Sequence, residues 1–247
     1  MKISIITAVF NNKDFIGDSI RSVITQDYKD VEYILVDGAS TDGTMDVVNK
    51  YKSDISKIIS EKDAGIFDAL NKGIKTATGD CIGFLHSDDV YADNGVISQV
   101  ANVLSGSGVD SVYGDLVYVS RQNPLKVIRY WHSGDFKYNS LRWGWMPPHP
   151  ALFIKKEIYD RFGYFDTSMK VSADYELILR FMLKHRISTA YLPRVLISMR
   201  LGGNSNKSIT NIYRKISEDC MAAKRYGIPR IGILAKNMRK FPQFFIR

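Results

Sequence analysis

Two adjacent carboxylates, Asp88 and Asp89, directly follow the apolar run Cys81–Leu85 and the dipeptide His86-Ser87. Adjacent carboxylates repel each other unless a cation or hydrogen bonds compensate for their charge. Mg²⁺ and Mn²⁺ are hard ions that favour carboxylate oxygens and the phosphates of a substrate. A metal site for a phosphorylated substrate therefore explains the pair, and a turn or helix cap is the structural alternative. His86 could add a ligand or serve the structure alone.

A further acid, Asp37, ends the apolar run Val31–Val36 and opens the turn Gly38–Thr44. Glycine permits a sharp turn there, and the hydroxyl and carboxylate side chains after it can cap the next helix. A capped turn thus explains most of the segment. It does not explain a carboxylate at Asp37, which must be solvated or paired. Such a group can accept hydrogen bonds from a base or from ribose hydroxyls.

These acids lie in a chain whose first hundred residues alternate short apolar strands with helices. The alternation predicts an α/β fold, with a mostly parallel central sheet flanked by helices. Ligands of such sheets bind beyond the carboxyl ends of the strands, where the acids above, Asn11 and Asp63 all fall. We predict strands at Lys2–Phe10, Val31–Val36, Ile55–Ser60 and Cys81–Leu85, and helices at Lys13–Gln26, Asp42–Tyr51, Ile66–Thr76 and near Asn94–Leu104.

The second half of the chain is less regular and contains no repeat, low-complexity tract or clear linker. We predict a strand at Ser111–Val119, a helix at Asp174–His185, an extended segment at Ser188–Met199 and a helix at Ile209–Tyr226. The sequence therefore favours one domain with a C-terminal helical appendage.

Composition and missing motifs exclude several classes of protein. The 247 residues are 45% hydrophobic and 24% charged, which is typical of a globular chain rather than a disordered one. Two cysteines cannot form a disulfide framework or a four-cysteine zinc site, so a reducing compartment is expected. No apolar run approaches the roughly 20 residues of a membrane span. The sequence also lacks a P-loop, a dinucleotide-binding glycine motif and a serine-hydrolase elbow.

Positive charge gathers at the C-terminus. The net charge is +8, and seven basic residues but no acidic ones lie between Lys224 and Arg247. A helical stripe of Ile228, Ile231, Leu234, Ala235 and Met238 runs through this segment, with Arg230, Lys236 and Lys240 mostly opposite. A basic amphipathic helix suits an anionic membrane surface. The alternative is a helix that packs on the body and exposes a solvated basic face.

The motifs taken together resemble glycosyltransferase family 2. The resemblance implies a GT-A fold, a nucleoside-diphosphate-sugar donor, a divalent metal ion (Mg²⁺ or Mn²⁺) and inversion at the anomeric carbon. It covers Ser4 to Asp89 with the motifs in order and resumes twice later. The segments that carry it are Ser4–Asn11, Asp37–Thr44, Ser60–Ile74, Gly79–Asp89, Pro148–Ala151 and Ala173–Arg180.

By this resemblance each acid acquires a role. Donor-binding residues lining the nucleoside pocket would be Thr7, Asn11, Asp37 and Asp63, with Asp88 as a further donor contact. Asp88 and Asp89 would hold the metal, and Asp174 would be the catalytic base. Two departures matter: the metal motif is Ser-Asp-Asp, and Ala173 stands where the family often has glutamate. The segment Met199–Asn206 also lacks the histidine that many relatives carry.

Helical phase tests the base independently. At 100° per residue, Asp174 lies on the centre line of an apolar stripe formed by Leu177, Ile178, Phe181 and Met182. Glu176 lies about 200° away, in phase with Arg180, which predicts an exposed ion pair. An acid at the inward start of a core helix is costly unless it is functional, although helix capping is the alternative. We therefore prefer Asp174 over Glu176 as the base.

An aromatic-rich stretch, Trp131–Pro150, offers candidates for binding the acceptor. Flat rings stack on the C–H faces of sugars, so Trp143 and Trp145 are expected acceptor contacts, with core anchoring as the equal alternative. His149 precedes a proline in the same stretch. It is expected to bind a phosphate or an acceptor hydroxyl, or to be a structural histidine.

The expected protein is an inverting, metal-dependent hexosyl- or N-acetylhexosaminyltransferase. It would move a sugar from a nucleoside-diphosphate sugar, with a UDP-sugar as the expected donor, to a hydroxyl of a saccharide or polyprenyl-diphosphate-linked saccharide. Residues 1–206 would form the catalytic domain, with a nucleotide-binding half at about 1–110 and an acceptor-binding half at about 111–206, and residues 207–247 the basic appendage. We expect a cytoplasmic protein, peripheral on the inner membrane face, that builds a surface polysaccharide such as O-antigen or capsule and binds no nucleic acid. A nucleotidyltransferase, and a non-catalytic nucleotide- or glycan-binding relative, are the alternatives.

Overall fold

The structure is a computed structural model that describes residues 1–202 and 209–238. The described strands form a single sheet in the order β3-β2-β1-β4-β8-β6-β9-β5, with β7 paired to β6. The strands are β1 (Ile3–Val9), β2 (Val31–Asp37), β3 (Lys57–Ser60), β4 (Cys81–Phe84), β5 (Val90–Tyr91), β6 (Ser111–Val119), β7 (Val127–Trp131), β8 (Leu152–Lys155) and β9 (Thr189–Arg200).

Four parallel strands, β1 to β4, form the half of the sheet that the alternating pattern predicted. β1 pairs with both β2 and β4, and β3 extends the sheet from β2. All seven residues of β1 are buried, because helices cover both faces of the strand. The predicted α/β fold with a mostly parallel sheet is confirmed.

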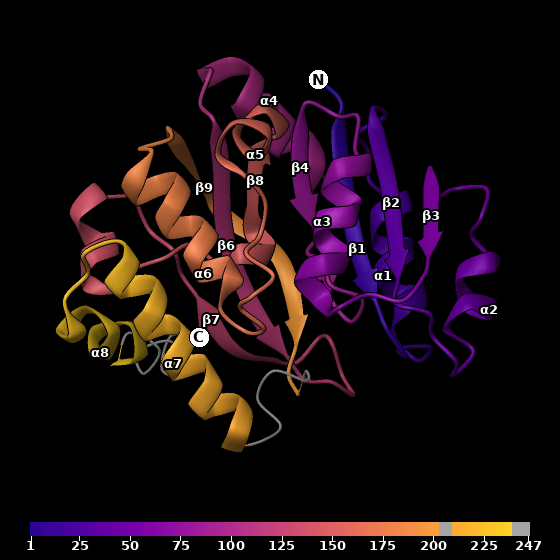
Figure 1. Cartoon of the computed structure of the whole chain (residues 1–247). Coiled ribbons are helices and arrows are strands. Elements are labelled where there is room, and N and C mark those ends of the chain that lie inside the picture. The colour runs from indigo at the N-terminus through magenta and orange to yellow at the C-terminus, as the bar shows by residue number, and fades with distance from the viewer. Residues whose placement is uncertain (203–208, 239–247) are drawn as a thin grey trace.

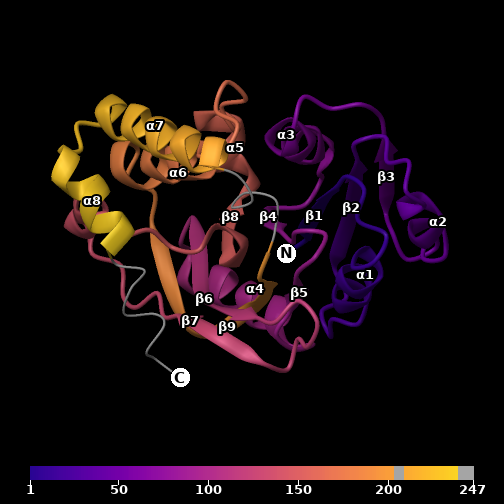
Figure 2. The ribbon, with the colours of Figure 1, turned by 90° about the horizontal axis from the view of Figure 1, so that it is seen from below.

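Helices lie on both faces of the sheet, as Figures 1 and 2 show. One face is covered by α1 (Ile16–Ile24), α2 (Thr44–Asn49) and α4 (Val96–Ser107), and the other by α3 (Ile66–Thr76), α5 (Lys156–Phe162) and α6 (Ala173–Ile178). Figure 2 shows α7 (Ile209–Arg225) stacked outside α6, with α8 (Arg230–Met238) beside it. The short helical turns η1 (Tyr138–Trp143) and η2 (His149–Ala151) precede β8.

Several elements of the second half depart from the sequence prediction, among them β7 and α5, which lie where no element was predicted. β8, which was not predicted, inserts antiparallel between β4 and β6. The single helix expected at Asp174–His185 is instead α6 followed by a π-helical turn, η3 (Leu179–Lys184). The predicted apolar stripe is nevertheless buried, since Leu177, Ile178, Phe181 and Met182 are each at most 1% exposed.

The C-terminal helices pack against the body of the molecule with their small and branched side chains. Ala222, Ala223, Ile228 and Ile233 belong to the same buried cluster as the residues of α6. No helix within residues 1–202 and 209–238 combines the length and the hydropathy needed to cross a bilayer. The predicted features at Gly203–Asn206 and at 239–247, including Lys240, lie outside the described residues.

The orientation of α8 corrects one prediction. Lys236, expected on a solvated basic face, is only 5% exposed, because its ammonium group pairs with the buried Asp219 at 2.9 Å. Burial lowers the pKa of Lys236 to about 8, although the charge of Asp219 opposes this shift. The helix is turned so that part of its apolar stripe faces outward instead. Ile231, Leu234 and Met238 are 58–61% exposed.

Candidate active site

Carboxylates from two neighbouring strands meet at the carboxyl edge of the sheet. Asp37 ends β2 fully buried, and its carboxylate accepts hydrogen bonds from the Ser60 hydroxyl (2.7 Å) and the Ser40 N–H (3.2 Å). Asp63 follows β3 and lies directly on Gly38, because a Cβ there would stand 2.5 Å from Asp63 Oδ2. Only glycine fits at position 38 without moving Asp63.

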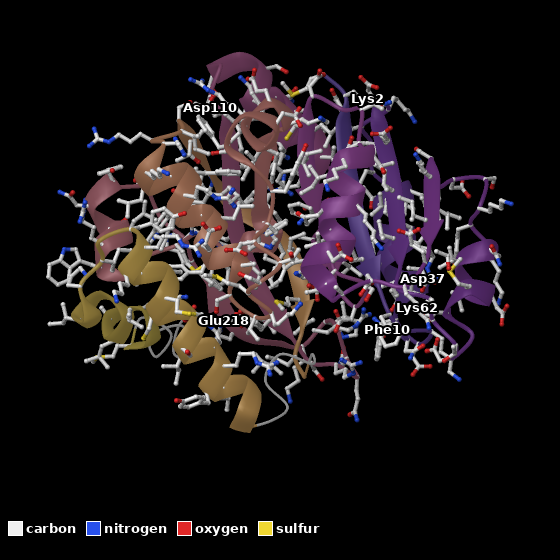
Figure 3. All side chains as sticks on the ribbon, viewed as in Figure 1. Lys2, Phe10, Asp37, Lys62, Asp110 and Glu218 are labelled. Atoms are coloured by element: carbon white, nitrogen blue, oxygen red, sulfur yellow. The ribbon has the colours of Figure 1, made fainter. Side chains whose placement is uncertain are left out.

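Phe10 lies beside these carboxylates, and the sequence analysis missed it. Its ring is 61% exposed at the end of β1, and a Cβ on Gly38 would be 3.3 Å from that ring. Figure 3 shows Phe10 and Asp37 close together at the same edge. A phenylalanine that ends a buried strand yet stays exposed offers a flat apolar face to a ligand. The sequence signal that could have pointed to Phe10 is its position at the end of the strand, immediately before Asn11.

The loops after β1, β2 and β4 are joined by side-chain hydrogen bonds. The Asn11 side chain accepts the Thr41 N–H at 2.9 Å, and the Asn12 side chain donates to the Ser87 hydroxyl at 2.8 Å. Asn11 itself adopts a left-handed backbone conformation with φ 48°. Backbone strain of this kind collects where a ligand must be held in a fixed place. These bonds bring the Asp37 cluster and the Asp88-Asp89 turn into one site.

Asp88 and Asp89 occupy different environments. The Asp88 side chain is 21% exposed, and its carboxylate lies 3.5 Å from the Arg121 guanidinium. Asp89 is fully buried and accepts the backbone N–H of Arg200 at 3.1 Å. Burial and the neighbouring Asp88 charge together raise the pKa of Asp89 well above its usual range, against the opposing effect of Arg200. The pair is thus electrostatically unfavourable without a further positive charge.

This pair fits a divalent metal on one direct observation. Asp89 Oδ2 is buried and has no hydrogen-bond partner among the described residues. The described part of the chain contains no cluster of three or more His, Cys, Asp or Glu side chains that could hold a metal alone. Hence a metal here would need further oxygen ligands from a bound diphosphate, which is how Mg²⁺ is usually held at phosphate sites.

Asp174 reaches the same site from the first turn of α6. It is half-buried, and its carboxylate accepts the Tyr175 N–H at 2.8 Å. Burial lowers the pKa of His86, while the charges of Asp88 and Asp174 oppose that shift, so both carboxylates lie near its ring. The expected base and a carboxylate of the expected metal pair therefore both influence the same imidazole.

His149 lies in the interior rather than on the surface. Its ring is 6% exposed and stacks on Phe84 with centroids 5.1 Å apart. Burial lowers its pKa to about 4, with Asp174 opposing and His86 adding to the shift. The imidazole is therefore neutral at pH 7. Its Nε2 is buried and has no hydrogen-bond partner within residues 1–202 and 209–238.

Glu176 corrects the prediction of an exposed ion pair. It does pair with Arg180 at 3.0 Å, but its side chain is only 2% exposed. Helix α7 covers it, with Arg225 3.4 Å away and the Tyr226 hydroxyl donating to the same carboxylate. Helical phase failed here because the face that looked outward in isolation is the face on which α7 packs.

Two other expected ligand contacts lie in the interior. Thr7 is fully buried, and its hydroxyl accepts a hydrogen bond from Tyr33 at 3.2 Å. Trp145 is 8% exposed and donates its indole N–H to the Ser133 carbonyl at 2.8 Å, so it anchors the core. Trp143 is 52% exposed, and the adjacent Gly144 packs against the backbone of α8. Among the tryptophans expected to contact the acceptor, Trp143 alone offers an accessible ring.

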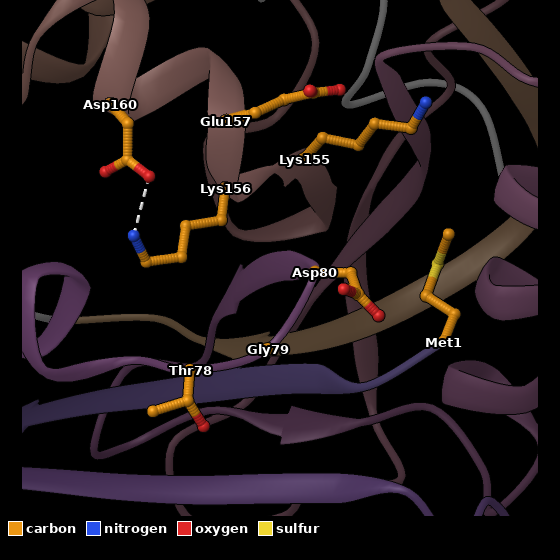
Figure 4. Close-up of a pocket in the computed structure, with 8 residues that line it drawn as sticks. All are labelled: Met1, Thr78, Gly79, Asp80, Lys155, Lys156, Glu157 and Asp160. Atoms are coloured by element: carbon orange, nitrogen blue, oxygen red, sulfur yellow. Dashed lines mark hydrogen bonds and ion pairs between the residues drawn. The ribbon is translucent and has the colours of Figure 1, made fainter.

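A shallow pocket of about 440 Å³ lies at the opposite edge of the sheet (Figure 4). It is lined by residues at the starts of β1 and β4 and at the end of β8, among them Met1, Asp80 and Lys155. The Lys156 ammonium group forms an ion pair with Asp160 at 2.7 Å. The pocket contains none of the residues described above, so it is separate from the candidate site.

The family model described as Glycosyl transferase family 2 matches residues 4–177. A PGL/p-HBAD biosynthesis glycosyltransferase of Mycobacterium tuberculosis is 26% identical over 249 residues, covering 99% of this chain and 92% of that protein. An uncharacterised glycosyltransferase of the same species is 32% identical over 186 residues, covering 72% of this chain and 68% of the relative.

Solved structures share the fold. TarS residues 1–349 from S. aureus, in complex with UDP-GlcNAc, match 99% of this chain with a TM-score of 0.71 and 16% identity, over 73% of that chain. This chain spans 44% of the longer TarS chain. The mannosyltransferase PcManGT from Pyrobaculum calidifontis, in complex with GDP-Man and Mn²⁺, matches 97% of this chain and 69% of its own, with a TM-score of 0.67 and 20% identity. The predicted GT-A fold is confirmed.

Proposed function

The chain belongs to glycosyltransferase family 2, and on that premise we propose that it transfers a sugar with inversion from a nucleoside-diphosphate sugar to an acceptor hydroxyl. The observation that carries the proposal is the meeting of three groups at one edge of the sheet. They are the Phe10–Asp37–Asp63 cluster, the Asp88-Asp89 pair and the single acid Asp174. We propose UDP as the nucleotide and a hexose or N-acetylhexosamine as the sugar, because a structural neighbour was solved with UDP-GlcNAc.

In this proposal the nucleoside lies on the first group. Phe10 stacks on the base, while Asp37 and Asp63 accept hydrogen bonds from base N–H or ribose hydroxyl groups. Asn11 holds the loop that shapes this pocket. Thr7 supports the pocket from the interior through Tyr33 and does not touch the nucleotide.

The Asp88-Asp89 pair would hold Mg²⁺ or Mn²⁺, which supplies positive charge to the leaving diphosphate when bound. A structural neighbour solved with both GDP-Man and Mn²⁺ supports this assignment. Arg121, 3.5 Å from Asp88 and 37% exposed, stands where it can add a second positive charge. We expect the chain's own ligands to hold the metal weakly until the donor binds.

Asp174 would act as the general base. It accepts the proton of the acceptor hydroxyl as that oxygen bonds to the anomeric carbon, and the bond from this carbon to the diphosphate oxygen breaks on the opposite face. A single base and one displacement invert the configuration at the anomeric carbon. The neutral His149 is a hydrogen-bond partner for an acceptor hydroxyl rather than a counter-charge, and Trp143 offers a ring to the acceptor sugar.

Replacing Phe10 with alanine is expected to weaken donor binding about tenfold or more, because base–aromatic stacking contributes about 1–3 kcal/mol. The exposed ring contributes little to the core, so the thermal midpoint should not change. Titration of UDP with Mn²⁺ by calorimetry measures this, and Phe10→Tyr is the matched control that keeps a ring. An unchanged Kd in Phe10→Ala would remove the stacking assignment.

We also propose that the C-terminal helices hold the enzyme on an anionic membrane surface that carries a polyprenyl-diphosphate-linked acceptor. Apolar side chains exposed by 48–77% gather on these two helices: Ile212, Tyr213, Ile216 and Met221 on α7, and Ile231, Leu234 and Met238 on α8. The basic residues from Lys224 onward, apart from Arg225 and Lys236, which form ion pairs within the molecule, supply the complementary charge, at about 1 kcal/mol each near such a surface. Assembly of a surface polysaccharide such as O-antigen or capsule on the cytoplasmic face fits this placement.

The double substitution Ile231→Ser with Leu234→Ser is expected to reduce binding to phosphatidylglycerol vesicles about tenfold or more. Each substitution removes a large apolar side chain that would otherwise be buried in the membrane. Co-sedimentation measures it, at low and at high salt. Leu125→Ser, which removes a 91%-exposed side chain from the β6–β7 connection, is the matched control and should bind normally. Equal sedimentation of the double variant and the unchanged protein would contradict the proposal.

A further inference from the structure

The inner faces of α7 and α8 carry buried charges, and these charges meet the segment that bears Asp174. Glu218 and Asp219 on α7 are 5% and 1% exposed, and Lys236 on α8 is 5% exposed. Burying an ion is unfavourable unless it is paired or hydrogen-bonded in full. Packing alone would be satisfied by apolar side chains at these positions. The groups that these buried ions contact therefore indicate what the ions do.

Glu218 contacts the backbone just before α6. Its carboxylate accepts three N–H groups, from Lys170 (2.9 Å), Val171 (2.8 Å) and Ser172 (2.9 Å). Ser172 is two residues before Asp174, so the carboxylate of one helix fixes the start of another. Figure 3 marks Glu218 on α7. Charge-assisted hydrogen bonds of this kind are stronger than neutral ones and fix direction as well as distance.

A second anchor reaches the residue after Asp174. The Lys236 ammonium group lies 3.3 Å from the centroid of the Tyr175 ring and 2.9 Å from the Asp219 carboxylate. Lys215 binds the other oxygen of Asp219 at 3.1 Å. One residue further on, Glu176 is held by Arg225 of α7 and by Tyr226. Residues 170–176 are therefore held before, beside and after Asp174.

We propose that Glu218 is a positioning residue for Asp174, and that the α7–α8 pair is part of the catalytic unit rather than an appendage that only attaches the enzyme to a surface. The proposal rests on the role of Asp174 as base. A general base must lie within hydrogen-bond reach of the proton it takes, and a displacement of about 1 Å can cost about 100-fold in rate. Glu218 fixes that position without touching the substrate.

Glu218→Gln tests this, because glutamine keeps the shape and one acceptor oxygen but replaces the other oxygen with an N–H₂ group, which leaves at least one of the three backbone N–H groups without an acceptor. We expect kcat for sugar transfer to fall about 10–100-fold while the Kd for UDP with Mn²⁺ changes less than twofold. The matched control is Glu32→Gln. Glu32 also accepts a backbone N–H (Thr78, 2.8 Å) and a hydroxyl (Ser4, 2.5 Å), but it lies at the opposite edge of the sheet. This control should lose stability and keep its kcat.

Combining Glu218→Gln with Asp174→Asn separates positioning from general damage. If Glu218 acts through Asp174, it lowers the rate only when Asp174 is present, so the double variant is as active as Asp174→Asn alone. The inference would be overturned if the fold-losses in rate of the two single variants multiply in the double variant. An unchanged kcat in Glu218→Gln would also overturn it. A fully active Asp174→Asn would instead overturn the proposed base. Should Glu218→Gln not fold, Lys236→Met probes the second anchor in the same cycle.

Discussion

Asp174→Asn is expected to slow sugar transfer by about 10²–10⁴-fold, the usual loss when a positioned base is removed. Asparagine keeps the size of the side chain and the oxygen that accepts the Tyr175 N–H, but it cannot take a proton. Folding and donor affinity should therefore survive. Steady-state kinetics with a UDP-sugar and a saccharide acceptor, alongside the thermal midpoint and the Kd for UDP, provide the measurement.

Two controls make this result specific. Asp46→Asn changes an acid in the first turn of α2, outside the candidate site, and should leave the rate unchanged. Glu176→Gln changes an acid two residues from Asp174 that is buried against Arg180, Arg225 and Tyr226. We expect this variant to lower the thermal midpoint rather than abolish the chemistry. If Asp174→Asn is fully active and a well-folded Glu176→Gln loses transferase activity, then Glu176 and not Asp174 is the base.

Removing the metal, or the carboxylates proposed to hold it, should have a comparable effect. Asp88→Asn, or excess EDTA with the unchanged protein, is expected to reduce transfer at least about 100-fold, because a bound metal contributes several kcal/mol of charge stabilisation at the diphosphate. Asp89→Asn should also weaken donor binding, since Asp89 Oδ2 is the buried oxygen without a described partner. Calorimetry of UDP with and without Mn²⁺ separates donor binding from rate.

Asp110→Asn is the control for the charge change. Asp110 accepts the Ser188 N–H at 2.7 Å, and Figure 3 shows it at the edge of the molecule opposite Asp37. It should leave the dependence on Mn²⁺ unchanged. Full transferase activity of the unchanged protein in EDTA would remove the metal from the proposal and leave Arg121 as the nearby positive charge.

The first half of the fold was predictable because its signals are local. Short apolar runs separated by capped turns predict buried parallel strands, and the carboxyl ends of such strands bring Asp37, Asp63 and Asp88 to one edge. Helix α3 begins and ends at the predicted residues, Ile66 and Thr76. The antiparallel strand β8 was not predictable in the same way. It is four residues long, and its place between β4 and β6 depends on partners distant in the sequence.

The errors at individual residues have the same origin. Glu176 and Lys236 looked solvated because their own helices have polar faces there, but α7 packs on both of those faces and supplies the counter-charges Arg225 and Asp219. Trp145 looked like a sugar-binding ring because the carbonyl that takes its indole N–H, at Ser133, is not visible in a pattern. Phe10 was missed because a phenylalanine at a strand end looks like core, whereas its exposure is a tertiary property.

The most direct test of the central claim follows the sugar and the nucleotide in one reaction. Proton NMR of the enzyme with Mn²⁺ and an α-linked UDP-sugar, with or without an acceptor, reports the first anomer released and the nucleotide formed. Inverting transfer predicts UDP together with a β-configured product, formed before mutarotation, and the same product formed about 10²–10⁴-fold more slowly with Asp174→Asn. An α-configured first product, or release of UMP or pyrophosphate in place of UDP, would contradict it.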